Sequence, residues 1–192
     1  MPKITTIKKI LIIGSGPIVI GQGCEFDYSG TQAIIALKEE GYSLVLVNPN
    51  PATMMSTPSL GAKVYMEPLN VEYVEKIIEV EQPDALIGTM GGQTALNLTL
   101  ALWDTGVLEK HHVRLLGVSV AAIRKGEERE TFKNLVTSLN LQSPSSQLVK
   151  NIEQARAFYK DNPLPLILRP SLTLGGEGGG IIEKEEDFDH MV

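Results

Sequence analysis

The chain has 192 residues, 43% of them hydrophobic, and its 17 basic and 23 acidic side chains give a formal net charge of −6. This length and apolar content suit one large domain or one and a half, and the negative charge disfavours nucleic acids and anionic membrane surfaces as partners. The single cysteine, Cys24, excludes an internal disulfide and a cysteine-based zinc cage. Because no apolar run approaches the about 18 residues of a membrane span, we expect a soluble protein of the reducing cytoplasm.

Short β-branched runs alternate with longer helical patterns as far as Gly117. The predicted strands are residues 10–13, 43–48, 63–66, 85–89 and 115–117, and the helices predicted between them are residues 29–40, 71–81 and 93–104. Gly41 and Gly106 follow two of these helices, as glycine often does at a helix end. The alternation predicts an α/β fold with a Rossmann-like parallel sheet that is covered by helices on both faces.

The pattern changes after Gly117. Two consecutive helices are predicted at residues 119–125 and 129–139, and the turn-rich residues 143–146 mark a boundary. Beyond it we expect a short strand at 147–149, a helix at 152–159, strands at 164–168 and 181–182, and a helix over 186–192. The chain should therefore have three parts: residues 1–118, a helical linker region at 119–142, and residues 143–192.

The first predicted strand runs into residues 14–17 (Gly-Ser-Gly-Pro), which superficially look like a dinucleotide-binding turn. The spacing does not fit, because Val19 stands where the third glycine should be. Residues 48–51 (Asn-Pro-Asn-Pro) also replace the ribose-binding acid after the second strand. Nicotinamide binding is therefore disfavoured. A tight turn with close backbone packing and an anion or ligand site both stay open.

Two other strings lie at predicted strand ends. Residues 89–94 (Thr-Met-Gly-Gly-Gln-Thr) stand where the fourth strand meets a helix, at the sheet edge where open α/β folds bind ligands. Alternatively, Thr89 or Thr94 could cap that helix and have no further role. Residues 48–51 have the same ambiguity, because asparagine and proline also favour turns for local reasons.

A glycine-rich loop, residues 175–180 (Gly-Gly-Glu-Gly-Gly-Gly), follows the strand that ends before Arg169. Glycine lets backbone N–H groups approach an anion, and a cation at the strand end adds charge, so the pair suits the phosphates of a nucleotide. The loop lacks the Gly-Lys-Ser/Thr of a P-loop, and Glu177 would repel phosphates unless it faces solvent or a metal. A linker or hairpin turn is the alternative.

The remaining polar residues carry weaker signals. Arg129 lies among three glutamates and is expected to form surface salt bridges. His111 and His112 are adjacent, and adjacent histidines rarely face one metal, so we expect a loop. Cys24 is expected to be buried and inert. Spacing alone assigns no catalytic residue and predicts no metal site.

Together these strings resemble the large-subunit family of carbamoyl-phosphate synthases, within the ATP-grasp superfamily. The resemblance spans essentially the whole chain, and the strings occur in matching order and spacing: residues 14–22, 24–30, 50–53, 90–97, and 169–171 followed by Gly175 and Gly176. The position of Pro51-Ala52-Thr53 near the start of the chain resembles the first of that family's two homologous halves.

The resemblance implies a pre-ATP-grasp domain to about Gly117 and then the first lobe of an ATP-grasp domain. In the family's first half, ATP phosphorylates bicarbonate to carboxyphosphate, and ammonia from a glutaminase small subunit converts this to carbamate, which the second half phosphorylates. By similarity, Arg129 and Arg169 would contact the nucleotide, and the backbone of Gly175 and Gly176 would approach its phosphates. Glu177 departs from the family, which usually has a small residue there.

The resemblance also implies that the magnesium (or manganese) ligands and the second ATP-grasp lobe lie beyond Val192. We therefore expect these 192 residues to be the start of a longer chain, to be inactive alone, to expose apolar surface, and to be less ordered after Ser143 than before it. A rival hypothesis is a non-catalytic assembly module that binds the glutaminase subunit or the remaining large-chain domains.

Overall fold

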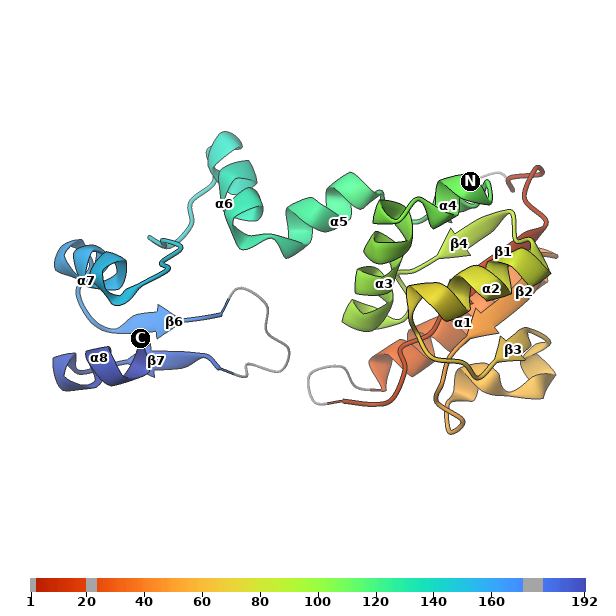
Figure 1. Cartoon of the computed structure of the whole chain (residues 1–192), viewed down its shortest axis with the longest axis horizontal. Coiled ribbons are helices and arrows are strands. Elements are labelled where there is room, and N and C mark those ends of the chain that lie inside the picture. The colour runs from red at the N-terminus through yellow and green to blue at the C-terminus, as the bar shows by residue number, and fades with distance from the viewer. Residues whose placement is uncertain (1–2, 20–23, 171–177) are drawn as a thin grey trace. The chain divides into compact units, whose positions relative to one another are not determined.

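The computed structural model describes residues 3–19, 24–170 and 178–192. The chain divides into two compact units, Met1–Ile123 and Arg124–Val192 (Figure 1). None of the helices in the described residues has the length and hydropathy that crossing a bilayer requires.

A five-stranded parallel sheet in the order β3-β2-β1-β4-β5 forms the centre of the first unit. Its strands are β1 (Lys9–Ile13), β2 (Ser43–Val47), β3 (Lys63–Tyr65), β4 (Ala85–Ile87) and β5 (Arg114–Leu116). The predicted α/β class and all five predicted strands of this unit are confirmed. Because β1 pairs with β2 on one side and β4 on the other, strand addition reverses direction at β1.

The helices of the first unit are α1 (Glu25–Glu39), α2 (Val71–Glu81), α3 (Gly92–Asp104) and the short α4 (Val107–Lys110), with 3-10 turns η1 (Met54–Ser56) and η2 (Pro58–Leu60). Gly41 and Gly106 have φ of 80° and 76° just after α1 and α3, as predicted for helix ends. The short elements α4, η1 and η2 were not predicted, because so few residues carry no periodic pattern.

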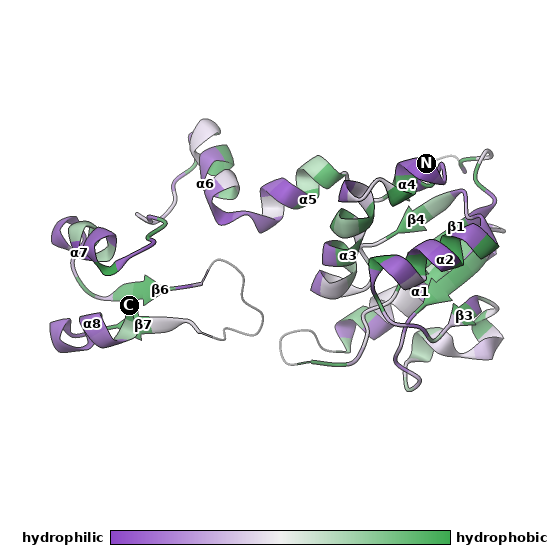
Figure 2. Ribbon diagram, in the orientation of Figure 1, coloured by the Kyte–Doolittle hydropathy of each residue, from purple (hydrophilic) through white to green (hydrophobic). Residues whose placement is uncertain are grey.

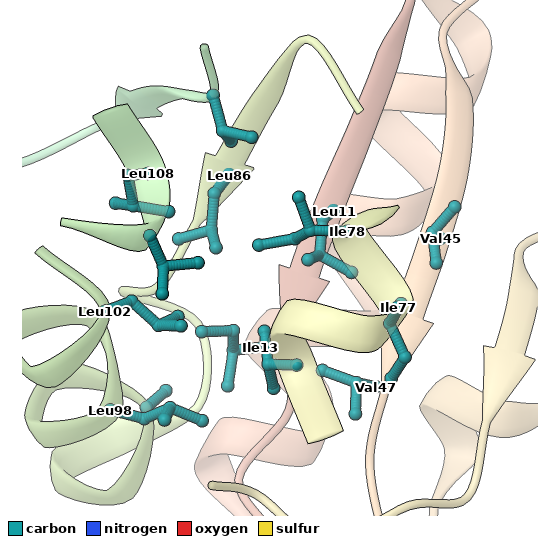
Figure 3. Close-up of a cluster of buried hydrophobic side chains, with 14 residues drawn as sticks. Leu11, Ile13, Val45, Val47, Ile77, Ile78, Leu86, Leu98, Leu102 and Leu108 are labelled. Atoms are coloured by element: carbon teal, nitrogen blue, oxygen red, sulfur yellow. The ribbon is translucent and has the colours of Figure 1, made fainter. Parts of the chain in front are cut away.

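Side chains of the strands alternate between two buried cores, one on each face of the sheet. One core joins β1 and β2 to α2, α3 and α4 (Figure 3): Leu11, Ile13, Val45, Val47, Val74, Ile77, Ile78, Leu98, Leu102 and Leu108. The other joins the same strands to α1 and η1: Ile10, Ile12, Leu44, Leu46, Ile34 and Met55. Figure 2 shows the matching hydrophobic colour on β1, β2 and β4. Helices therefore cover both faces, as the sequence predicts.

The second unit is smaller and contains α6 (Arg129–Ser138), α7 (Ile152–Asp161), the antiparallel pair β6 (Leu166–Leu168) and β7 (Gly180–Ile182), η3 (Glu185–Asp187) and α8 (Phe188–Met191). Helix α5 (Val120–Glu127) crosses the boundary between the units. The buried residues in the core of the second unit are Ala155, Ile182 and Phe188, and the Phe188 ring stacks on Tyr159 with centroids 5.1 Å apart.

Much apolar surface of the second unit is exposed. Ile167 and Ile181 are paired across β6 and β7, so they lie on the same face, and they are 70% and 56% exposed. Helix α6 is amphipathic but buries none of its residues, and Phe132 on it is half exposed. The predicted exposure of apolar surface is confirmed for these residues.

One predicted strand of the second unit is wrong. Residues 147–149 have no regular secondary structure, and Leu148 is exposed. Leu148 and Val149 are apolar, but a strand also needs a hydrogen-bonding neighbour, and the two-stranded sheet consists of β6 and β7 alone within the described residues.

Candidate functional site

The loops that follow the parallel strands meet at one edge of the five-stranded sheet. Residues 14–19 follow β1, residues 48–53 follow β2, and residues 88–91 follow β4. The reversal of strand order lies between β1 and β4, and open α/β folds bind ligands at such a point. The predicted strings at residues 14–17, 48–51 and 89–94 therefore lie at the same carboxyl edge.

Gly14, the first glycine after β1, lies where the backbone of this loop packs closely against the neighbouring loops. A Cβ on Gly14 would stand 2.6 Å from Cγ of Asn48, whose side chain is fully buried. A Cβ on Gly91 would stand 2.3 Å from the carbonyl oxygen of Gly14, so the loops after β1 and β4 touch through backbone. The close-packing hypothesis for Gly14 is thus confirmed, while the ligand hypothesis for residues 14–17 stays a prediction.

A buried carboxylate organises the loops after β1 and β2. Asp27, in the first turn of α1, is 8% exposed, and its Oδ1 accepts hydrogen bonds from Oγ1 of Thr53 at 2.8 Å and Oγ of Ser15 at 3.4 Å. The helix N-terminus also favours negative charge at this position. Sequence reasoning missed this cluster. The predicted helix began at residue 29, whereas α1 begins at Glu25 and includes Asp27, and Thr53 lies 26 positions further along the chain.

The loop after β2 is held by its own polar side chains. Asn48 Oδ1 accepts from the backbone N–H of Asn50 at 3.2 Å, Asn50 Oδ1 accepts from that of Ala52 at 3.0 Å, and Thr53 caps η1 by accepting from Met55 N. The turn-forming role predicted for residues 48–51 is therefore confirmed. Within the described part of the chain, Nδ2 of Asn48 is buried without a hydrogen-bond partner, so we expect an ordered water or ligand oxygen to complete it.

The predicted helix cap at residues 89–94 is wrong. The N-cap residue of helix α3 is Gly91 and not a threonine, and no side chain makes a capping hydrogen bond there. Gly91 has no room for a side chain, because its backbone lies against that of Gly14. Gly92 has a φ of 62°, which favours glycine. Thr89 is left half-buried at the sheet edge, 3.5 Å from the position a Cβ would take on Gly117.

In the second unit, the glycine-rich loop joins two antiparallel strands. Leu168 pairs with Gly180, and a Cβ on Gly178 would stand 3.1 Å from Cγ of Pro170, so the two arms of the loop are in contact where they leave the strands. Arg169 directly follows β6 and is exposed. The hairpin and the phosphate site are thus compatible, because a hairpin loop can present backbone N–H groups to an anion.

The other predicted nucleotide contacts are placed as follows. Arg129 is the first residue of α6 and is exposed. Gly175, Gly176 and Glu177 lie outside the described residues. The predicted burial of Cys24 is wrong, since it is exposed just before α1. His111 and His112 lie in the turn between α4 and β5, as predicted for a loop.

Comparisons with known proteins match both parts of the chain. Residues 6–125 match the family model of the carbamoyl phosphate synthase preATP-grasp domain, and residues 128–192 match that of the carbamoyl-phosphate synthase L chain, ATP binding domain. The chain belongs to the carbamoyl-phosphate synthase large-chain family. It is 53% identical over all 192 residues to the carbamoyl phosphate synthase large chain, N-terminal section, of Aquifex aeolicus. It is 52% identical over the same length to the large chain of Clostridium botulinum.

The chain spans 34% of the Aquifex relative and 18% of the Clostridium relative. Among solved structures, it resembles the biotin carboxylase-beta-gamma-ATP complex from Campylobacter jejuni with a TM-score of 0.68 and 21% sequence identity. That alignment covers 96% of this chain and 40% of the carboxylase, and it shows a common fold. The family membership places Arg169 and the glycine-rich hairpin in the part of the chain that matches an ATP-binding domain.

Proposed function

We propose that the chain forms the amino-terminal part of an ATP-dependent carbon–nitrogen ligase that makes carbamoyl phosphate, and that it contributes one side of the ATP site where bicarbonate is phosphorylated to carboxyphosphate. The observation that carries this proposal is the antiparallel hairpin of β6 and β7, in which exposed Arg169 directly follows β6, on the segment that leads to the glycine-rich residues, in the region matching an ATP-binding domain. We further propose residues 1–118 as the pre-ATP-grasp domain, 119–142 as a helical linker region, and 143–192 as the start of the ATP-grasp domain.

The residues of the β6–β7 hairpin suit a nucleoside triphosphate. The two arms of the hairpin meet at Pro170 and Gly178, and Arg169 carries a fixed positive charge beside this contact. In the proposed site, Arg169 and Arg129 pair with phosphate oxygens, and backbone N–H groups of Gly175 and Gly176 approach them. Phosphoryl transfer depends mainly on such positioning and charge neutralisation. Bound ATP supplies the phosphoryl group, and Mg²⁺ or Mn²⁺ held by residues outside this chain neutralises its charge.

Further protein surface is needed to complete the site. The second unit has a small core and exposes Ile167, Ile181 and Phe132, which suits burial against additional large-chain domains. We propose these domains and a glutaminase small subunit, the source of ammonia, as partners. The 192-residue polypeptide alone is then not expected to catalyse the reaction.

The first experiment tests the role of Arg169 in a complete large chain assembled with its glutaminase. Arg169→Ala should lower kcat/KM for ATP in bicarbonate-dependent ATP hydrolysis by on the order of 10²-fold, because one charged donor to the reacting phosphates is lost. Arg156→Ala is the matched control, since Arg156 lies in the same unit, is 57% exposed and pairs with Asp189 on the surface. Equal activity of the two variants would refute the role of Arg169.

A second experiment tests the need for the rest of the site. The 192-residue polypeptide is assayed alone and after mixing with a polypeptide that carries the remainder of the large chain. We expect carbamoyl phosphate only from the mixture. Bicarbonate-dependent ATP hydrolysis by the 192-residue polypeptide alone would contradict the proposal that it supplies only one side of the site.

A further inference from the structure

A cluster of carboxylates and an imidazole joins helices α2 and α4 near the amino-terminal end of β5. Glu75 and Glu79 lie one turn apart on α2, and His111 follows the last residue of α4. The Nε2 atom of His111 is 3.4 Å from Oε1 of Glu75 and 3.9 Å from Oε1 of Glu79. One ligand atom from each residue lies within 4.8 Å of the other two.

We propose that Glu75, Glu79 and His111 bind a divalent transition-metal ion, with Zn²⁺ as the best fit. Zinc binds nitrogen and carboxylate oxygen at about 2.0–2.2 Å, so two ligands of one tetrahedral ion stand roughly 3.3–3.6 Å apart. The distances from His111 to the two carboxylates are already close to that separation. Three protein ligands leave the fourth position to water. The imidazole favours Zn²⁺ over Mg²⁺ and Ca²⁺, which prefer oxygen ligands.

Two of the three side chains are partly shielded from water, whereas Glu79 is 51% exposed. His111 is 18% exposed and Glu75 is 27% exposed. The adjacent His112 has a φ of 57° and is not a member of the cluster.

Lys110 competes with the metal for the same carboxylates. Its Nζ is 2.8 Å from Oε1 of Glu75 and 3.8 Å from Oε1 of Glu79, and its side chain is 61% exposed. The ammonium group balances the two carboxylates when no metal is bound. Because the lysine side chain is long and mostly in solvent, it can withdraw when a doubly charged ion replaces it. The geometry thus predicts that removing Lys110 strengthens metal binding, whereas a purely structural ion pair predicts no metal binding at all.

Within the first unit, the site lies at the opposite edge of the five-stranded sheet from the loops that follow its strands. His111 precedes β5, so it is near the amino-terminal end of that strand, whereas the loops discussed above follow the carboxyl ends of β1, β2 and β4. A metal here would link α2 to the turn after α4 and stabilise the first unit.

The test titrates ZnCl₂, and in parallel MgCl₂, into the 192-residue protein with isothermal calorimetry and a competing chromophoric zinc chelator. All variants carry Cys24→Ser, because the exposed thiol would bind zinc itself. We expect saturable binding of one Zn²⁺. His111→Ala and Glu75→Gln should each weaken it at least about tenfold, and His112→Ala should leave it unchanged. Lys110→Met should tighten it severalfold, and MgCl₂ should not compete.

A structural readout separates ligation from a general effect on folding. In NMR spectra of the imidazole nitrogens, Zn²⁺ should shift Nε2 of His111 and not the nitrogens of His112. The proposal is overturned if zinc does not bind below about 100 μM, which corresponds to about −5.5 kcal/mol, or if the His111 and His112 variants bind equally. Unaltered zinc affinity in Lys110→Met would also overturn it.

Discussion

The carboxylate at the end of α2 offers the sharpest stability prediction. Glu81 is 7% exposed and accepts hydrogen bonds from Nζ of Lys63, from the Tyr65 hydroxyl at 2.5 Å, and from Nζ of Lys9 at 3.2 Å. It therefore ties α2 to β1 and β3. The hydrogen bond from Lys63 is the largest cause that lowers the pKa of Glu81 from 4.5 to about 2. Removing this charge should destabilise the first unit.

The magnitude follows from linkage between proton binding and folding. A shift from 4.5 to about 2 corresponds to roughly 3 kcal/mol at neutral pH. Because Lys63 is 61% exposed, solvent screening reduces the expected effect to about 2 kcal/mol. The pKa is lower in the folded state, so this stabilisation is present above pH 4.5 and is lost as the pH falls from 4.5 toward 2.

The assay is urea unfolding of Glu81→Gln followed through the fluorescence of Trp103, which lies on α3 in the first unit and is the only tryptophan of the sequence. The variant should lose about 2 kcal/mol of unfolding free energy at pH 7 and less than half of that at pH 3. Glu72→Gln on the same helix is the control, because its exposed pair with Lys76 contributes about 0.3–0.5 kcal/mol. An equal loss at both pH values would refute the linkage argument.

Three further outcomes are expected. Gly14→Ala should lower the free energy of unfolding by about 1–3 kcal/mol, because its Cβ would stand 2.6 Å from a buried side-chain atom. Gly126→Ala is the control: Gly126 lies in a helix with open space around it, so this change should leave the free energy of unfolding unchanged or raise it by up to about 1 kcal/mol. Thermal unfolding measures both. Thr53→Ala should lower the free energy of unfolding by about 1–3 kcal/mol, because buried Asp27 loses the hydroxyl that donates to it at 2.8 Å. In the same assay, Thr131→Ala, at an exposed position, should lower it by less than about 0.5 kcal/mol. Amide hydrogen exchange should be faster over residues 143–192 than in β1, and uniformly strong protection there would contradict the small core of the second unit.

The sheet of the first unit could be predicted from the sequence because its signals are local. Each strand is a short apolar run, each long helix has a periodic face, and Gly41 and Gly106 mark two helix ends. The strand expected at residues 147–149 shows the limit, because a strand depends on a partner that local composition does not supply. The cap expected at Thr89 or Thr94 failed for a similar reason. The backbone of a distant loop, at Gly14, determines which residues stand at the start of α3.

The polar clusters could not be predicted because their members are far apart in sequence. Asp27 meets Thr53 from another element, and His111 meets Glu75 across 36 positions. Cys24 looked like an inert core residue, since nothing in its neighbours shows which way it faces. Arg129 was predicted to contact the nucleotide only by resemblance to a family, whereas the position of Arg169 at a strand end before the glycine-rich loop also indicated it. Both stay predictions.

The unequal cores of the two units bear on how ATP would bind. The sheet of the first unit is covered on both faces, so its carboxyl edge is held in place before any ligand arrives. The β6–β7 hairpin that carries Arg169 has only one covered face, and Ile167 and Ile181 are exposed on the other. In the proposed site, holding this hairpin around phosphates would therefore cost free energy that ligand contacts must offset. We therefore expect any domain that buries Ile167 and Ile181 to lower that cost and to raise the affinity of the proposed site for ATP, even where the domain makes no contact with the nucleotide.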